Sequence, residues 1–212
     1  MKKNKSYLEV YWIAGTQDIP IGSLPEVLEE ALQSGITCFQ YREKGKGSLQ
    51  KFEDRKQMAR ICQNLCRKYQ TPFIVNDDVE LALEIEADGI HVGQEDQHIL
   101  EVLPLFKEKI VGLSCYDEKE INSANQLKGL SYYGIGPVFG TISKEDAKPP
   151  IGVEKLSELV NKASKPTVAI GGINIKNIAE ILQTEVGGAA VISAVTQAKS
   201  ISQTIRQLKG QL

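Results

Sequence analysis

The sequence is short of the features that define several large classes of protein. Its net charge at pH 7 is only −2 over 212 residues, so it has no excess of positive charge to attract nucleic acid or an anionic membrane surface. No uninterrupted apolar run approaches the roughly 18 residues of a membrane-spanning helix. Charged residues make up 25% of the chain and hydrophobic ones 42%, which is the composition of a folded globular chain. We therefore expect a cytoplasmic globular protein with no nucleic-acid and no membrane partner.

Cysteine and histidine are also scarce. The four cysteines are Cys38, Cys62, Cys66 and Cys115. A chain of this length needs no disulfide framework to fold. Two of the cysteines lie one helical turn apart, but no further cysteine or histidine nearby completes a metal site, so we expect all four in the core. The histidines give little support for zinc, because His91 alternates with apolar neighbours and His98 begins a predicted helix.

Short runs rich in β-branched residues alternate with amphipathic stretches along the chain. Eight runs have the length and composition of buried strands; they are residues 8–13, 37–40, 72–75, 89–92, 110–113, 132–135, 167–170 and 189–192. Stretches with apolar residues at helical spacing follow them; these are residues 24–34, 52–69, 80–83, 99–106, 118–127, 153–160, 175–182 and 201–208. The order is therefore a strand followed by a helix, repeated eight times.

This alternation predicts a parallel sheet with helices outside it. A doubly wound open sheet has the same order, but it is typically marked by a Gly-x-Gly-x-x-Gly turn after the first strand. The chain has only Ala14-Gly15-Thr16 at that point, and no linker or change of composition divides it. We therefore predict an α/β fold in which residues 1–212 form a single (β/α)8 TIM barrel, with the active site at the C-terminal ends of the strands.

Polar residues follow almost every predicted strand at the end where such a barrel builds its active site. Three of them are cations from two loops, Arg42, Lys44 and Lys144. Arginine offers a planar fork to oxygen pairs and lysine a movable point charge, so the set suits a phosphate-bearing ligand. The alternative is that these are solvated surface side chains. Their shared place at one mouth favours the phosphate interpretation.

Asp77 and Asp96 end neighbouring predicted strands, so their carboxylates can meet over the barrel. Magnesium commonly takes one or two carboxylates together with ligand phosphates, which makes this pair the predicted metal ligands. Asp78 and Glu95 are adjacent alternatives. A helix cap is the competing interpretation for the aspartates at 77 and 78, and it is stronger for Asp78.

Gly171-Gly172 and Ser193 follow the last two predicted strands. Barrel loops in this position often bind phosphate through backbone N–H groups, although tight-turn packing also explains paired glycines. The loop over residues 139–151 is long for a connection of this kind, which predicts a lid, with a plain surface excursion as the alternative. Two separate anion sites would serve two phosphorylated substrates.

The chain resembles the thiamine-phosphate synthase family in five segments, which are residues 40–44 (QYREK), 76–78 (NDD), 88–96 (DGIHVGQED), 134–139 (GIGPVF) and 169–174 (AIGGIN). They occur in order over nearly the whole predicted barrel. The resemblance implies a transferase that joins 4-amino-2-methyl-5-hydroxymethylpyrimidine diphosphate to 4-methyl-5-(2-phosphoethyl)-thiazole. The products are thiamine phosphate and diphosphate, and the family also tends to form homodimers.

The resemblance further implies a role for each matching residue. Those on the pyrimidine diphosphate are Gln40 beside the ring and Arg42, Lys44, Asn76 and Lys144 on the diphosphate. Asp77 and Asp96 hold the Mg²⁺ cofactor, Ser114 lies near the reacting centre, and Ser114 and Lys144 are the catalytic pair. The residues on the thiazole phosphate are Thr141, Ser143, Gly172, Ile192 and Ser193. The family reacts by a dissociative route, which needs no protein nucleophile and fits a chain without a Ser/His/Asp or Cys/His set.

Three rival functions share parts of this pattern. A thiazole tautomerase-like paralogue uses the same barrel but needs no diphosphate or metal, and Tyr116 stands where a catalytic histidine is expected in it. A non-catalytic thiamine-phosphate-binding barrel needs no Asp77/Asp96 pair. A phosphosugar isomerase needs a Glu or His base at a strand end in a less metal-like setting. The cations and paired aspartates favour the synthase.

Overall fold

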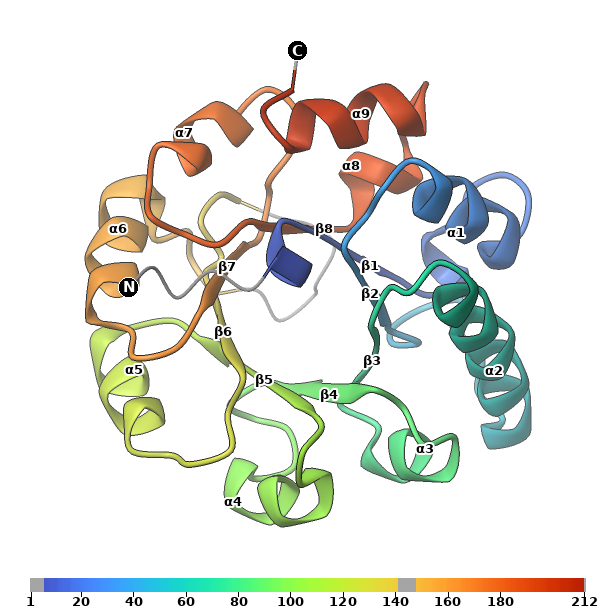
Figure 1. Ribbon diagram of the computed structural model, residues 1–212, viewed down its shortest axis with the longest axis horizontal. Coiled ribbons are helices and arrows are strands. Elements are labelled where there is room, and N and C mark those ends of the chain that lie inside the picture. The colour runs from blue at the N-terminus through green and yellow to red at the C-terminus, as the bar shows by residue number, and fades with distance from the viewer. Residues whose placement is uncertain (1–5, 141–147, 212) are drawn as a thin grey trace.

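Eight parallel strands close into a barrel in sequence order, β8 pairing with β1. The computed structural model describes residues 6–140 and 148–211, and Figure 1 looks down the barrel with the helices around it. The strands are β1 (Val10–Ala14), β2 (Cys38–Tyr41), β3 (Phe73–Asn76), β4 (Gly89–Val92), β5 (Ile110–Cys115), β6 (Tyr132–Ile135), β7 (Thr167–Ile170) and β8 (Ala189–Val191). The predicted TIM barrel is confirmed, and the doubly wound sheet is excluded.

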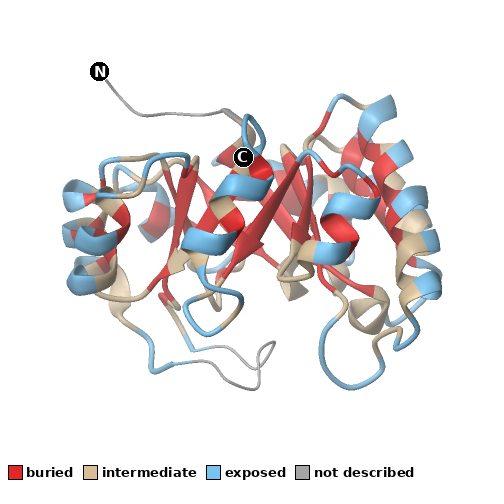
Figure 2. Cartoon of the chain, turned by 90° about the horizontal axis from the view of Figure 1, so that it is seen from below, coloured by how far each residue is buried: buried red, intermediate tan, exposed pale blue. Residues whose placement is uncertain are grey.

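The strands separate two apolar layers because successive side chains point to opposite faces of a sheet. In β1, Val10, Trp12 and Ala14 pack into the layer between sheet and helices. Tyr11 and Ile13 point into the barrel instead. Figure 2 shows the result, with strands that are buried over most of their length and helices that are buried on one face and exposed on the other.

The helices of the outer layer are α1 (Leu24–Gln33), α2 (Phe52–Lys68), α3 (Val79–Glu84), α4 (Ile99–Val102), α5 (Glu118–Asn125), α6 (Gly152–Lys162), α7 (Ile178–Leu182), α8 (Ser193–Thr196) and α9 (Ile201–Leu208). Short 3-10 turns are η1 (Ser6–Leu8), η2 (Thr16–Asp18) and η3 (Leu103–Phe106). None of the helices in the described ranges is long and apolar enough to cross a membrane.

Two helix predictions need correction, and one helix was not predicted. The single helix expected over residues 99–106 is α4 followed by η3, since Pro104 has no N–H to continue the α-helical ladder. Helix α7 begins at Ile178 rather than at residue 175, because Asn174 and Asn177 form a hydrogen-bonded turn before it. Helix α8 was not predicted, since four residues are too few to show a helical period.

All four cysteines are buried and free, which confirms them as core residues. Cys62, Cys66 and Cys115 lie in the layer outside the sheet and Cys38 lies inside the barrel. Burial raises the pKa of the Cys115 thiol to about 12, so that thiol stays protonated and unreactive near neutral pH.

Candidate active site

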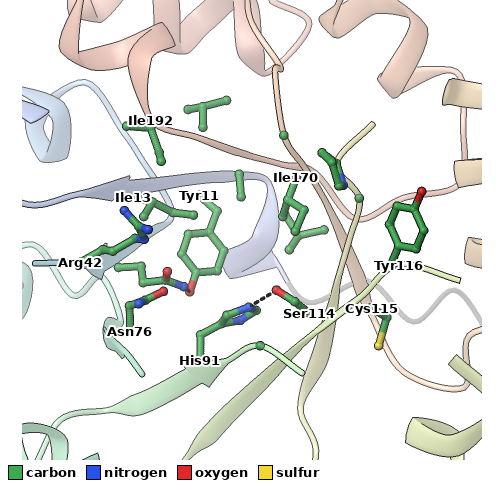
Figure 3. A pocket seen from close by; sticks show the side chains of 18 of the residues that line it. Tyr11, Ile13, Arg42, Asn76, His91, Ser114, Cys115, Tyr116, Ile170 and Ile192 are labelled. Atoms are coloured by element: carbon green, nitrogen blue, oxygen red, sulfur yellow. Dashed lines mark hydrogen bonds between the residues drawn. The ribbon is translucent and has the colours of Figure 1, made fainter. Parts of the chain in front are cut away.

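A cavity of about 220 Å³ opens at the carboxyl ends of the strands. Every strand or the loop that follows it contributes to the wall. Figure 3 shows Arg42 and Asn76 on the left of the view, His91 and Ser114 in its lower part, and Ile192 and Ile170 above them. The predicted site residues that the structure describes all line this one cavity; they are Gln40, Arg42, Lys44, Asn76, Asp77, Asp96, Ser114, Gly172, Ile192 and Ser193. Thr141, Ser143 and Lys144 lie outside the described residues.

The loop after β2, which contains Lys44, is fastened by a carboxylate that the sequence analysis gave no role. Glu43 accepts hydrogen bonds from the backbone N–H of Thr16 at 2.7 Å and from that of Leu49 at 2.9 Å. These bonds fasten the loop after β2 to the loop after β1. They fix the backbone on both sides of Lys44, and Arg42, the residue before Glu43, is buried to 7% exposure.

Lys44 bridges the two predicted metal ligands. Its Nζ lies 2.5 Å from Asp77 Oδ2 and 3.3 Å from Asp96 Oδ1. Asp96 also accepts a hydrogen bond from the backbone N–H of Gly93 at 2.7 Å through its second oxygen. The predicted meeting of the two carboxylates is therefore seen, with an ammonium group between them.

The backbone and the charge of Asp77 are both unusual. Its φ of +60° is uncommon for a residue other than glycine, and the N–H of Asp78 donates to Asn76 O across it at 2.7 Å. Burial and the neighbouring Asp96 carboxyl raise the pKa of Asp77 to about 6, despite the opposing effect of Lys44. Two carboxylates with one ammonium between them make a site that favours a further cation.

Asp78 takes the competing role that the sequence allowed. Its side chain accepts a hydrogen bond from the Leu81 N–H at 3.0 Å and so caps α3. Its other oxygen lies 3.3 Å from Arg55 Nε. Asp78 is therefore directed toward the helix layer, whereas Glu95 joins Asp96 on the wall of the cavity.

A chain of hydrogen-bonded side chains crosses the floor of the cavity. Gln40 Nε2 donates to Tyr11 Oη at 2.8 Å, and the two phenol oxygens of Tyr11 and Tyr132 are 2.7 Å apart. Tyr132 Oη lies 2.9 Å from His91 Nδ1, and His91 Nε2 lies 2.9 Å from Ser114 Oγ. Gln40 and Ser114 were predicted as site residues, and His91 was considered only for zinc. Tyr11 and Tyr132 were missed because each lies inside a strand, where an aromatic residue is typical of a core.

The glycine pair after β7 is confined by packing. Gly171 and Gly172 have φ of +89° and +65°. A Cβ atom on Gly172 would lie 2.5 Å from Gly140 O and 2.8 Å from Phe139 Cβ. The tight-turn explanation is therefore correct for the backbone, and the turn also exposes Gly172 to the cavity. Ser193 begins α8 directly after β8.

Lys148 is a further cation that sequence reasoning missed. Its Nζ lies 3.0 Å from Glu120 Oε1 and 4.8 Å from the centroid of the Tyr116 ring. Glu120 also accepts a hydrogen bond from the Tyr116 N–H at 2.7 Å. These contacts hold the end of the loop after β6 against the loop after β5, at the rim of the cavity.

The fold and the cavity together define a class, a TIM barrel whose mouth carries cations, paired carboxylates and a glycine turn. The chain matches the family described as thiamine monophosphate synthase over residues 10–195. It belongs to that family, which confirms the resemblance seen in the motifs.

Individual relatives agree with this assignment. The thiamine-phosphate synthase of Listeria welshimeri is 55% identical over 206 residues, covering 96% of this chain and 99% of that protein. Thiamine-phosphate synthase 1 of Streptococcus pneumoniae is 46% identical, with coverage of 98% and 99%. The solved thiamine phosphate pyrophosphorylase from Pyrococcus furiosus has a TM-score of 0.85 at 35% identity and covers 97% of this chain and 95% of its own.

Proposed function

We propose that this barrel joins a pyrimidine diphosphate to a thiazole phosphate and releases thiamine phosphate and diphosphate. The activity, that of a thiamine-phosphate synthase and hence of a transferase, follows from the family. What remains a proposal is the assignment of substrates to the two sides of the cavity. The observation that supports it best is the bridge from Lys44 to Asp77 and Asp96, since neither the tautomerase nor a product-binding barrel needs such a group.

The diphosphate belongs on the side of Arg42, Lys44 and Asn76. Departure of diphosphate requires that its growing negative charge be neutralised in place. Arg42 supplies a fixed fork because it is nearly buried. Lys44, whose side chain is 46% exposed, can turn from the carboxylates toward an arriving anion. Lys144, which lies outside the described residues, stays a diphosphate ligand predicted from the sequence.

Asp77 and Asp96 would hold Mg²⁺. The fit is supported by the ammonium group that already lies between the two carboxylates, in the position where a cation is attracted. No cluster of three or more His, Cys, Asp or Glu side chains within residues 6–140 and 148–211 can hold a metal alone. Water and diphosphate oxygens must therefore complete the shell, as is usual for magnesium. The bound ion would supply positive charge to the leaving group.

The opposite side of the cavity suits the thiazole phosphate. Its wall is apolar, with Ile170 and Ile192 projecting inward (Figure 3). The turn at Gly172 and the start of α8 at Ser193 stand where barrels commonly bind phosphate. Thr141 and Ser143 complete this side only as predictions. Two faces of one cavity would then bring the substrates together and exclude water from the reaction.

The direct test incubates the protein with both precursors and measures thiamine phosphate and diphosphate. Equal amounts of the two products, with neither formed when one precursor is omitted, are expected. Conversion of a thiazole phosphate isomer in the absence of the pyrimidine would instead favour the tautomerase. Binding of thiamine phosphate without any turnover would favour the non-catalytic barrel. The single-domain organisation, the cytoplasmic location and the homodimer stay predictions.

A further inference from the structure

The floor of the cavity holds a histidine for which the proposed reaction has no assigned role. His91 lies within β4 and is 7% exposed. Its ring occupies space left by glycines on the next two strands, β5 and β6. A Cβ atom on Gly112 would lie 2.4 Å from His91 Nδ1, and one on Gly134 would lie 3.2 Å from His91 Cε1. The backbone of β5 and β6 is therefore adapted to hold an imidazole at this place.

The protonation states of Tyr11, Tyr132 and Gln40, which are linked to this imidazole by hydrogen bonds, are known. Burial holds the pKa of Tyr11 and of Tyr132 well above the usual range for a phenol. Each tyrosine therefore keeps its single hydroxyl proton. The Gln40 amide nitrogen can only donate, and it donates to Tyr11 Oη at 2.8 Å.

These facts favour one direction of donation along this row of hydrogen bonds. Since Tyr11 Oη accepts from Gln40, its own proton goes to Tyr132 Oη, 2.7 Å away. The proton of Tyr132 then goes to His91 Nδ1 at 2.9 Å. A neutral imidazole that accepts at Nδ1 carries its proton at Nε2. It donates that proton to Ser114 Oγ at 2.9 Å (Figure 3).

The reverse direction of donation satisfies the hydroxyl groups less well. Ser114 would donate to His91, His91 to Tyr132, and Tyr132 to Tyr11. The Tyr11 oxygen would then accept from both Tyr132 and Gln40, and its own proton would be left to the sulfur of Cys38. Sulfur is a weaker acceptor than the oxygen of Tyr132, so this direction is less favourable.

We propose that His91 is a positioning residue, which fixes Ser114 as a hydrogen-bond donor toward the cavity. Because Ser114 Oγ accepts from His91, its own hydroxyl proton is available to a bound substrate. Resting on the proposed function, the partner is an acceptor atom of the pyrimidine diphosphate, either a ring nitrogen or a diphosphate oxygen. Tyr11 and Tyr132 act only through the imidazole.

The position of the imidazole proton can be measured on the free protein. The chain contains only two histidines, His91 and His98, so ¹⁵N-histidine labelling gives a two-residue spectrum, and His98→Gln assigns it. Long-range ¹⁵N–¹H correlations are expected to show His91 with its proton on Nε2 alone. A proton on Nδ1, alone or together with Nε2, would overturn the proposal. This readout does not depend on which reaction the protein catalyses.

Kinetic measurements test whether the hydrogen bonds of Tyr132 and His91 affect the reaction through Ser114. Tyr132→Phe is expected to lower kcat/KM roughly tenfold, the effect of about one neutral hydrogen bond. In a Ser114→Ala background, Tyr132→Phe should lower kcat/KM by less than about twofold, because the Ser114 hydroxyl through which it acts is absent. An equal loss in both backgrounds would overturn the proposal. The matched control is Tyr133→Phe, since that phenol lies outside the barrel and bonds to Asn125 and Ser164.

The conservative variants of His91 separate donation from simple packing. In His91→Gln the amide nitrogen can replace Nε2 as donor to Ser114, whereas the shorter side chain of His91→Asn cannot reach it. Activity should therefore be retained better in His91→Gln, and equal losses would contradict the proposed donation. Affinities for inorganic diphosphate and for the pyrimidine alcohol, compared between wild type and Ser114→Ala, identify which acceptor Ser114 binds.

Discussion

Lys44 Nζ lies 2.5 Å from Asp77 Oδ2, and this contact joins the loop after β2 to the end of β3 across the mouth of the barrel. The same ammonium group reaches Asp96 at 3.3 Å. Lys44 therefore occupies the position where a divalent cation would be attracted. In the proposed function, Lys44 would exchange its carboxylate partners for phosphate oxygens when the diphosphate binds. The two carboxylates would then be free to hold a metal ion.

Replacing Lys44 should separate its two roles. In Lys44→Met the two carboxylates lose their ammonium partner, so Mg²⁺ should bind the substrate-free protein about tenfold more tightly. The KM for the pyrimidine diphosphate should rise, because a phosphate-binding cation is lost. Calorimetry with Mg²⁺ and steady-state kinetics measure the two effects. Lys46→Met, in the same loop and exposed, is the control; weaker metal binding in Lys44→Met would contradict the competition.

Neutralising either carboxylate should abolish most of the turnover without unfolding the protein. Asparagine tolerates the positive φ of Asp77, and in Asp96→Asn the side-chain oxygen can still accept from Gly93. We expect kcat/KM to fall by about 100-fold or more in each variant. Circular dichroism and thermal unfolding check the fold. Asp54→Asn, exposed in the first turn of α2, should have normal kinetics, and near-normal kinetics in both site variants would remove the metal assignment.

Glu43 should matter through the loop that it fastens. Glu43→Ala leaves the N–H groups of Thr16 and Leu49 without their acceptor, which should cost about 1–3 kcal/mol of stability. The KM for the pyrimidine diphosphate should rise more than that for the thiazole phosphate. Glu29→Ala, which breaks an exposed ion pair with Lys68, should cost under about 1 kcal/mol. Equal changes in both KM values would show that Glu43 has no local effect on the diphosphate side.

Alanine substitutions at Gly172 and Gly152, which both have positive φ, separate the effect of backbone strain from the effect of moving the proposed phosphate-binding turn. Gly172→Ala introduces a methyl group 2.5 Å from Gly140 O, whereas a Cβ on Gly152, at φ +78°, meets nothing within 4 Å. Both variants should lose about 1 kcal/mol from strain. Only Gly172→Ala should raise the KM for the thiazole phosphate, by roughly tenfold, since its loop must move. A similar KM in the two variants would argue against phosphate binding at this turn.

Periodicity was sufficient for the barrel itself. The bounds of β4, β6 and β7 coincide with the predicted runs, because buried parallel strands form short continuous apolar segments. The helix over residues 99–106 was wrong at Pro104, whose effect depends on where the helix would have continued. Helix α8 is too short for any periodic signal.

The sequence was more informative about residues at strand ends than about contacts between side chains inside the barrel. The structure brings Asp77 and Asp96 to one cavity because strand ends converge in a barrel, and their role as metal ligands stays a prediction. His91 was considered only for zinc, because a polar side chain inside a strand shows its role only through contacts with other strands. The available signal was glycine at 112 and 134 on the next two strands, β5 and β6, which leaves room for a ring. The bridge by Lys44 could not be predicted, since it depends on the direction of a loop.

The most direct test of the proposed chemistry is a single-turnover measurement of thiamine phosphate formation, with and without Mg²⁺. The protein is first stripped of metal with a chelator and shown to be folded. We expect rapid coupling in Mg²⁺ and a rate at least about 100-fold lower without it, because the leaving diphosphate then lacks its charge partner. An unchanged rate in the metal-free protein would contradict the role of Asp77 and Asp96, and with it the placement of the diphosphate.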